Sequence, residues 1–330
     1  MDTVDALRFA RELIDIDSTT GQEKAAGEWL AMRLEGLGYT VTRQQVADDR
    51  FNVLATIDEP SVVLSTHYDC VPPFFPSRIV ERQLVGRGAC DAKGILAAQV
   101  AAAERLRADG RRRVGLLFVV GEERGSEGAV AANAASIGSK FLVNGEPTEN
   151  RLATGTRGIL RVKLKARGRA GHSSAPEHFE SAIEKLVDAI VRLRDLELPS
   201  NPTFGRTSYS VGLIEGGVAP NVVPARASAE VMFRTVGDAD DVLGTVKVLE
   251  PLVQVKEILR VPPVRLHTIP GIPSASFPFT TDIPLLTRWG APLLFGPGSH
   301  LVAHTDDEHV SLDEFDAAIE AYVQIVNALL

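Results

Sequence analysis

Between residues 61 and 144, short apolar strands alternate with helices, and this pattern restricts the chain to few folds. We expect strands at 61–67, 114–120 and 140–144, an alanine-rich helix near 93–108 and another near 126–136. Strands that alternate with helices indicate a mostly parallel, helix-covered sheet of the α/β class. Ligands of such sheets gather at the carboxyl ends of the strands. Polar residues just after each strand are therefore the candidates for function.

The pattern changes near residue 158. A strand at 159–166 is followed by a helix near 178–195, two strands, a second helix and a last strand. This order is typical of a compact α+β module of the split βαβ, ferredoxin-like type. The first of these helices has apolar residues at helical spacing, which predicts its core face: Phe179, Ile183, Leu186, Ile190 and Leu193.

The domain boundaries follow from this change of pattern. The proline-rich stretch 261–274 reads as the linker that leaves the module, after which α/β character resumes and a capping box at Ser311 opens the last helix. We therefore expect one catalytic α/β domain formed by residues 1–157 and 266–330. An inserted α+β domain would occupy residues 158–265.

Composition excludes several classes of protein. The 330 residues are 45% hydrophobic and 24% charged, as in ordinary globular proteins, with a net charge of −8. An acidic chain is a poor partner for nucleic acid or an anionic membrane surface. The N-terminus has no signal pattern, the longest apolar run is too short for a membrane span, and two cysteines, Cys70 and Cys90, make no disulfide framework. We expect a cytoplasmic protein with reduced thiols, although either cysteine could serve as a weak extra ligand.

The stretch VVLSTHYDCVPP (62–73) shows how the expected strands end. It runs from strand residues into His67 and Asp69. Residues two apart in an extended segment point to the same side, so the imidazole and the carboxylate can meet. Such a pair usually performs chemistry or binds metal.

Four further stretches place acids and histidines where strand ends are expected. These are GRGACDAKG with Asp91, GEERGSEG with Glu122 and Glu123, NGEPTEN with Glu146, and GPGSHLVAHTDDEHV with His300, His304 and His309. Singly, they could be a helix cap, loop charges, a turn residue and a surface histidine. Together, such carboxylates would repel one another in a cleft at several kcal/mol each. Two divalent cations would resolve this, leaving about one positive charge for a bridging hydroxide to neutralise.

Seven ordered segments give the chain a resemblance to a known family. STHYDCVPP, GRGACDAKG, GEERGSEG, NGEPT, GHSSAPE, GGVAPNVVPARASAEVMFR and AHTDDEHV span nearly all of it. They resemble the M20 family of metallohydrolases, which includes acetylornithine deacetylase, succinyl-diaminopimelate desuccinylase, aminoacylase and glutamate carboxypeptidase. The resemblance implies a zinc-peptidase-like catalytic domain with an inserted lid or dimerisation domain, and thus a homodimer.

The resemblance also implies roles for the strand-end residues. His67 and Glu146 would complete the shell of one metal, Glu123 and His304 that of the other, and Asp91 would bridge both. Asp69 would orient His67. Glu122 would act as general base and then acid toward a metal-bridged hydroxide.

Residues of the insert would complete the active site. By resemblance, His172 polarises the scissile carbonyl, in dimeric members from the partner subunit. Asn221 and Arg234 match positions that hold the oxyanion region and a substrate carboxylate, which suits the planar guanidinium fork. Thr280, Thr281 and Asp282 lie where the family lines its substrate pocket.

The resulting prediction is a metal-dependent hydrolase that cleaves the amide bond of an N-acyl amino acid, in the manner of the deacetylase and desuccinylase branch. The alternative is an M20 carboxypeptidase or dipeptidase acting on short peptides. Zinc is the default metal for this ligand set, and cobalt and manganese fit the same shell. A non-catalytic relative would have lost a ligand or Glu122, and none is lost. A dinucleotide-binding oxidoreductase is excluded because Asp91 replaces the third glycine after Gly86 and Gly88.

Overall fold

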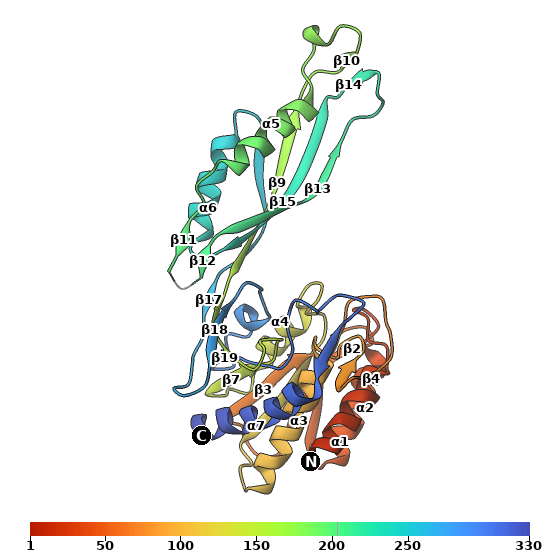
Figure 1. The fold of residues 1–330 in the computed structure, drawn as a ribbon, viewed down its shortest axis with the longest axis vertical. Helices are drawn as coiled ribbons and strands as arrows, with labels where there is room; N and C mark the ends of the chain where they lie inside the picture. The colour runs from red at the N-terminus through yellow and green to blue at the C-terminus, as the bar shows by residue number, and fades with distance from the viewer. Residues whose placement is uncertain (203) are drawn as a thin grey trace. The chain divides into compact units, whose positions relative to one another are not determined.

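The computed structural model describes residues 1–202 and 204–330. The chain forms two compact units (Figure 1). Unit 1 comprises Met1–Thr154, Leu266–Ala275 and Thr281–Leu330, and unit 2 comprises Gly155–Arg265 and Ser276–Thr280. The expected domains, 1–157 with 266–330 and 158–265, differ from these units in the assignment of residues 155–157 and 276–280.

Unit 1 is built on a six-stranded mixed sheet. Its strand order is β1-β2-β6-β3-β7-β19. The pairings β6–β3, β3–β7 and β7–β19 are parallel, whereas β1–β2 and β2–β6 are antiparallel. The strands are β1 (Thr40–Ala47), β2 (Arg50–Thr56), β3 (Val62–His67), β6 (Val114–Val119), β7 (Phe141–Asn144) and β19 (Ala291–Leu294). The predicted α/β class is therefore confirmed, with an antiparallel ribbon at one edge.

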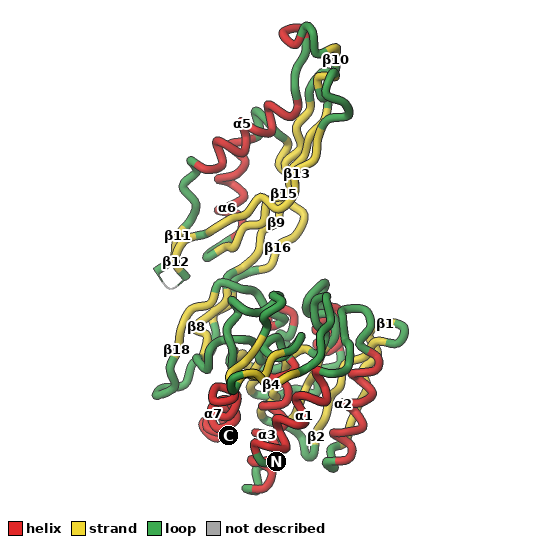
Figure 2. The backbone as a smooth tube through the Cα atoms, turned by 45° about the vertical axis from the view of Figure 1, so that its right-hand side comes forward, coloured by secondary structure: helices red, strands yellow, loops and turns green. Residues whose placement is uncertain are grey.

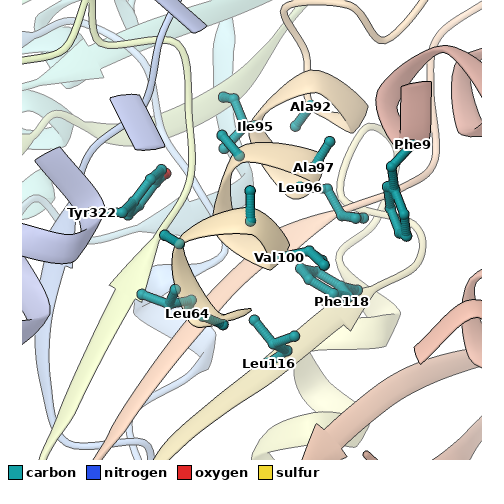
Figure 3. Close-up of a cluster of buried hydrophobic side chains, with 14 of the residues drawn as sticks. Phe9, Leu64, Ala92, Ile95, Leu96, Ala97, Val100, Leu116, Phe118 and Tyr322 are labelled. Carbon is teal, nitrogen blue, oxygen red and sulfur yellow. The ribbon is translucent and has the colours of Figure 1, made fainter. Parts of the chain in front are cut away.

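Five α-helices accompany this sheet in the described part of unit 1. They are α1 (Thr3–Ile14), α2 (Lys24–Gly36), α3 (Lys93–Ala108), α4 (Glu127–Ala134) and α7 (Leu312–Leu329). Helix α3 is buried along nearly its whole length because its many alanines allow close packing on the sheet. Figure 3 shows its Ile95, Leu96 and Val100 between sheet residues such as Phe118 and, from α7, Tyr322. This central position fixes the loop that leads into α3.

The described residues also form two three-stranded sheets of short strands. One three-stranded sheet has the order β20-β5-β4 and another the order β17-β8-β18. Their strands are β4 (Arg78–Val80), β5 (Gln83–Val85), β20 (His309–Ser311), β8 (Leu152–Thr156), β17 (Val264–Arg265) and β18 (Ser274–Phe277). Within the proline-rich stretch 261–274, for which the sequence predicts a linker, β17 pairs with β8. A single-turn 3₁₀ helix, η3 (Ile283–Leu285), follows.

Unit 2 has the split βαβ topology that the order of elements predicts. The antiparallel sheet runs β13-β15-β9-β16, and α5 and α6 lie on one side of it (Figure 2). The main elements are β9 (Gly158–Arg167), α5 (Ala182–Arg194), β13 (Ser208–Gly216), β15 (Arg226–Thr235), α6 (Ala239–Val246) and β16 (Gln254–Val261). The minor ones are β10 (Gly171–His172), η1 (Pro176–His178), β11 (Ser200–Asn201), β12 (Gly205–Arg206), β14 (Val222–Val223) and η2 (Lys247–Leu249).

The core face of α5 agrees with the expected one at Leu186 and Leu193 and differs from it at Ile183. The helix buries Ala182, Leu186, Ala189 and Leu193. Ile183, which was expected in the core, is 38% exposed. The reason is that α5 has apolar residues on two faces, so periodicity alone does not decide which face packs on the sheet.

Candidate metal centre and active site

The candidate residues of unit 1 lie at the carboxyl ends of its parallel strands. β3 ends at His67, which pairs in register with Val119 at the end of β6. Glu122 and Glu123 follow β6, and Glu146 follows β7. Parallel strands end at one edge of a sheet, so these side chains are brought together by topology. The loop before α3 and the loop after β19 add Asp91 and His304 at the same edge.

Three of these side chains form a first potential metal-binding group. Nε2 of His67 lies 3.0 Å from Oδ1 of Asp91. Glu146 joins them, and one ligand atom from each of the three lies within 4.8 Å of the others. The side chains of His67 and Glu146 are buried, and that of Asp91 is 11% exposed.

A second group uses the other oxygen of Asp91. Nε2 of His304 lies 3.2 Å from Oδ2 of Asp91 and 2.9 Å from the Glu123 carboxylate. His304 has a φ of 63°, a left-handed conformation that is uncommon for residues other than glycine and often occurs at functional sites. Asp91 therefore faces one imidazole with each oxygen. This is the arrangement that a ligand shared between two ions requires.

The carboxylate of Asp69 supports the glutamate segment as well as His67. Its Oδ1 is 3.6 Å from Nδ1 of His67, an ion-pair distance, while the backbone carbonyl of Asp69 lies 3.0 Å from that nitrogen. The two carboxylate oxygens accept the backbone N–H groups of Glu122 at 3.1 Å and Glu123 at 3.3 Å. The hydroxyl of Thr20 donates to Oδ2 at 2.9 Å. Asp69 thus fixes the backbone of the two glutamates, which sequence reasoning did not anticipate.

Electrostatic interactions set the ionisation of this cluster. Burial, together with the nearby Glu146, raises the pKa of Glu122 well above its usual value, and Glu122 belongs to neither group. Hydrogen bonds to Asp91 and Glu123 raise the pKa of His304 to about 10. Burial opposes ionisation of Asp91, but hydrogen bonds from His304 and His67 lower its pKa. Without a cation, bound protons on groups such as Glu122 and His304 therefore compensate the negative charge of this cluster.

The donor set fits two divalent cations. Burial raises the pKa of Glu146 well above its usual value, and its Oε1 has no hydrogen-bond partner among the residues that the structure describes. A buried carboxylate oxygen without a partner costs free energy unless a cation or proton compensates it. Mixed imidazole and carboxylate ligands are those of zinc and related ions. The chemistry of the residues present therefore fits such ions.

The candidate residues of unit 2 lie at two ends of its sheet. His172 pairs with Val222 between β10 and β14, and the N–H of Ser173 donates to the carbonyl of Asn221 at 3.1 Å. His172 is exposed, and its Nδ1 lies 2.8 Å from the hydroxyl of Ser174. Arg234 lies near the far end of β15, where its Nη1 donates to Thr280 at 3.3 Å. The unit brings His172 and Asn221 together at the end of the sheet where β10 and β14 lie (Figure 1), and Arg234 lies toward the opposite end of β15.

Two buried acids close to the metal-binding groups escaped a functional assignment or received only a weak one. Asp282, expected at the pocket lining, is 1% exposed. Glu308 is fully buried and was not singled out. The available signal was its place in the AHTDDEHV motif, four residues after His304.

Known proteins match the chain over nearly its whole length. The family model described as the peptidase dimerisation domain matches residues 154–250, and that of peptidase family M28 matches residues 52–158. A probable carboxypeptidase of Aspergillus clavatus is 36% identical, with 98% of this chain and 82% of the relative covered. A peptidase M20 domain-containing protein of Schizosaccharomyces pombe is also 36% identical, covering 96% of this chain and 82% of the relative.

Solved structures share the fold. A tripeptidase from Staphylococcus aureus superposes with a TM-score of 0.85 at 19% identity, covering 100% of both chains. An M20 family metallo-carboxypeptidase from Sulfolobus solfataricus has a TM-score of 0.75 at 18% identity, covering 100% of this chain and 99% of the other. The fold and the donor set are those of a metallopeptidase. The chain belongs to the M20 family and is a hydrolase. No helix in residues 1–202 and 204–330 is long and apolar enough to cross a membrane.

Proposed function

We propose that this chain is a two-metal carboxypeptidase that releases the C-terminal residue of short peptides. The observation that carries the proposal is the pair of ligand groups that share Asp91. Relatives 36% and 35% identical to the chain are named probable carboxypeptidases, which favours the peptidase alternative over the N-acyl amino acid deacylase expected first. A dipeptidase is the variant of the same chemistry that acts on the smallest substrates.

In unit 1, some of the proposed residues bind the metal ions and another, Glu122, transfers protons. His67, Asp91 and Glu146 would hold one ion, and Asp91, Glu123 and His304 the other. When bound, such ions polarise a carbonyl and acidify water, and zinc, cobalt or manganese suits this shell. Glu122 stands outside both groups and has a raised pKa, so it is the base that accepts the proton of the attacking water. It then delivers that proton to the leaving amine.

Arg234 is the proposed contact for the substrate's free carboxylate. It is half-buried, and its described side-chain hydrogen bond goes to the neutral hydroxyl of Thr280. A guanidinium without an ion pair among the described residues is suited to bidentate pairing with a carboxylate. This group distinguishes a carboxypeptidase from an enzyme that requires a free amino terminus.

His172 and Asn221 are proposed to reach the substrate from a second copy of the chain. Within one unit 2 they lie at the opposite end of β15 from Arg234, and nine residues of strand span roughly 30 Å. One small substrate therefore does not contact all three from the same unit. A homodimer resolves this, because one subunit supplies Arg234 and the other supplies His172 and Asn221.

An exposed apolar face of unit 2 supports self-association. Ile183, Val187 and Val191 are 38%, 51% and 49% exposed at a spacing of four residues on α5. The edge strand β13 exposes Leu213 and Ile214, at 58% and 64%. A side chain placed at Gly216 would lie 3.0 Å from Ile183, so the helix face and the strand adjoin. Exposed apolar surface beside a free strand edge is typical of an interface, and the matching family model is named for dimerisation.

Sedimentation tests the dimer. Wild type should sediment as a dimer at micromolar concentration and Val187→Asp as a folded monomer. Val130→Asp is the matched control, because Val130 is a 55% exposed valine on α4 of unit 1. A wild type that stays monomeric at all concentrations would refute the assignment of His172 to the partner.

A panel of blocked substrates tests the reaction. A dipeptide with a blocked amino group and a free carboxylate should be hydrolysed, and its C-terminal amide should react about 10- to 100-fold more slowly, as expected for a lost charged hydrogen bond. Arg234→Met should remove this preference. Faster turnover of N-acetyl or N-succinyl amino acids would establish the deacylase instead.

A further inference from the structure

We propose that Glu308 is a positioning residue that fixes the backbone around Asp91 and, through it, both positions of the metal centre. This inference rests on the two-metal site proposed above. Glu308 lies in the same loop as His304, four residues further along the chain. Its side chain is 1% exposed, and that of its partner Arg87 is 2% exposed. A buried charge of this kind needs compensation from several directions.

The carboxylate of Glu308 binds the segment that carries Asp91. Oε1 accepts three backbone N–H groups, from Gly88 at 2.9 Å, Cys90 at 3.1 Å and Asp91 at 3.0 Å. Oε2 lies 2.6 Å from Nη1 of Arg87. The carboxylate therefore organises the turn before α3 from a loop 217 residues away in the sequence.

Arg87 is itself firmly anchored. Its Nε donates to the carbonyl of Pro73 at 3.2 Å, and its guanidinium lies 4.9 Å from the centroid of the Phe75 ring. The backbone N–H of Gly86 donates to the carbonyl of Glu308 at 3.2 Å, which ties the two loops together again. These contacts hold the guanidinium of Arg87 in place. Through its ion pair, Arg87 in turn positions the Glu308 carboxylate that binds the turn before α3.

The consequence for the metal centre follows from the place of Asp91. Its backbone N–H is bound by Glu308, and its two carboxylate oxygens face His67 and His304 at 3.0 and 3.2 Å. A shift of this backbone moves the one side chain that both ligand groups share. Hydrogen bonds from backbone N–H to a charged carboxylate are stronger than those to a neutral acceptor. Removing the charge should therefore loosen both metal positions at once.

The test is metal affinity in Glu308→Gln, which keeps the size of the side chain and removes its charge. Zinc dissociation constants are measured by competition with a chromogenic chelator, and the absorption spectrum of the cobalt-loaded protein reports ligand geometry. Supporting groups around metal ligands typically contribute 10- to 100-fold in affinity. We expect a loss of that size for both ions and an altered cobalt spectrum.

Glu23→Gln is the matched control. Glu23 is also fully buried in unit 1, lies 2.6 Å from Nη2 of Arg50 and accepts the N–H of Gly21 at 2.9 Å. Its described hydrogen bonds reach none of the proposed ligands. This variant should lose stability and keep the wild-type affinity for both ions.

The outcomes separate this inference from the proposed function. Wild-type affinities and an unchanged cobalt spectrum in Glu308→Gln would overturn the positioning role while leaving the centre intact. Equal losses in Glu308→Gln and Glu23→Gln would also overturn it, because they would show general destabilisation. A wild type that binds no metal would refute the proposed centre itself. If Glu308→Gln does not fold, Glu308→Asp keeps the charge on a shorter side chain, and a folded variant with unweakened metal binding would overturn the inference.

Discussion

Replacing Asp282 by asparagine should stabilise the metal-free protein. The carboxylate is 1% exposed, and neither of its oxygens has a hydrogen-bond partner within the described residues. Burial raises its pKa from 3.8 to about 6, and the Ser126 hydroxyl, beside it but outside hydrogen-bonding geometry, opposes the rise only in part. Each pH unit between the folded and unfolded pKa is worth about 1.4 kcal/mol. The ionised side chain therefore destabilises the fold by about 3 kcal/mol above pH 6.

Because the pKa of Asp282 is raised in the folded state, the effect of the substitution depends on pH in a defined direction. Between pH 3.8 and 6 the folded state binds more protons than the unfolded state, so stability falls as pH rises. In urea unfolding of chelator-treated protein, Asp282→Asn should gain about 3 kcal/mol at pH 8 and about half of that at pH 5. Glu59→Gln removes an exposed acid of unit 1 and should stay within about 0.5 kcal/mol of wild type at both pH values. A loss of stability at pH 8, or a gain that does not shrink at pH 5, would refute the reasoning.

Three further outcomes are expected. Glu122→Gln should lower kcat by about 10²- to 10⁴-fold while metal content, measured by elemental analysis, stays at the wild-type level; a variant with near-wild-type kcat would exclude Glu122 as the base. Cys70 should resist iodoacetamide at pH 8 in the folded protein, since burial raises its pKa to about 12, and rapid labelling seen by mass spectrometry would contradict this. Phe118→Ala should lower the free energy of unfolding by about 3–5 kcal/mol, because Phe118 is fully buried between the sheet and α3; a loss below 1 kcal/mol in urea titrations would be too small for such a cavity.

The parts of the fold that depend on local periodicity could be predicted from the sequence. An alanine-rich helix was expected near 93–108, and α3 lies there. The strand β3 ends at His67 as expected, because the apolar run stops there. The strand order and the antiparallel ribbon β1–β2–β6 were not predicted, because pairing partners are set by tertiary packing.

The candidate site, too, could be predicted from the sequence only in part. Residues that directly follow strands, such as Glu123 and Glu146, were found because the topology of a parallel sheet brings strand ends together. Glu308 was missed because three of its partners are backbone N–H groups, which leave no trace in side-chain identity, and its side-chain partner Arg87 lies far away in the sequence. The same reason hid the contacts of Asp69 with the backbone of Glu122 and Glu123.

The most direct test of the account is the metal content of protein purified without chelator. Elemental analysis of the wild type should give about two transition-metal ions per chain, as expected for a two-metal hydrolase. His304→Ala removes one of the three ligands of the second group and leaves His67, Asp91 and Glu146 in place. We predict that its content falls toward one ion per chain. A wild type that remains empty after zinc or cobalt is added back would contradict the central claim.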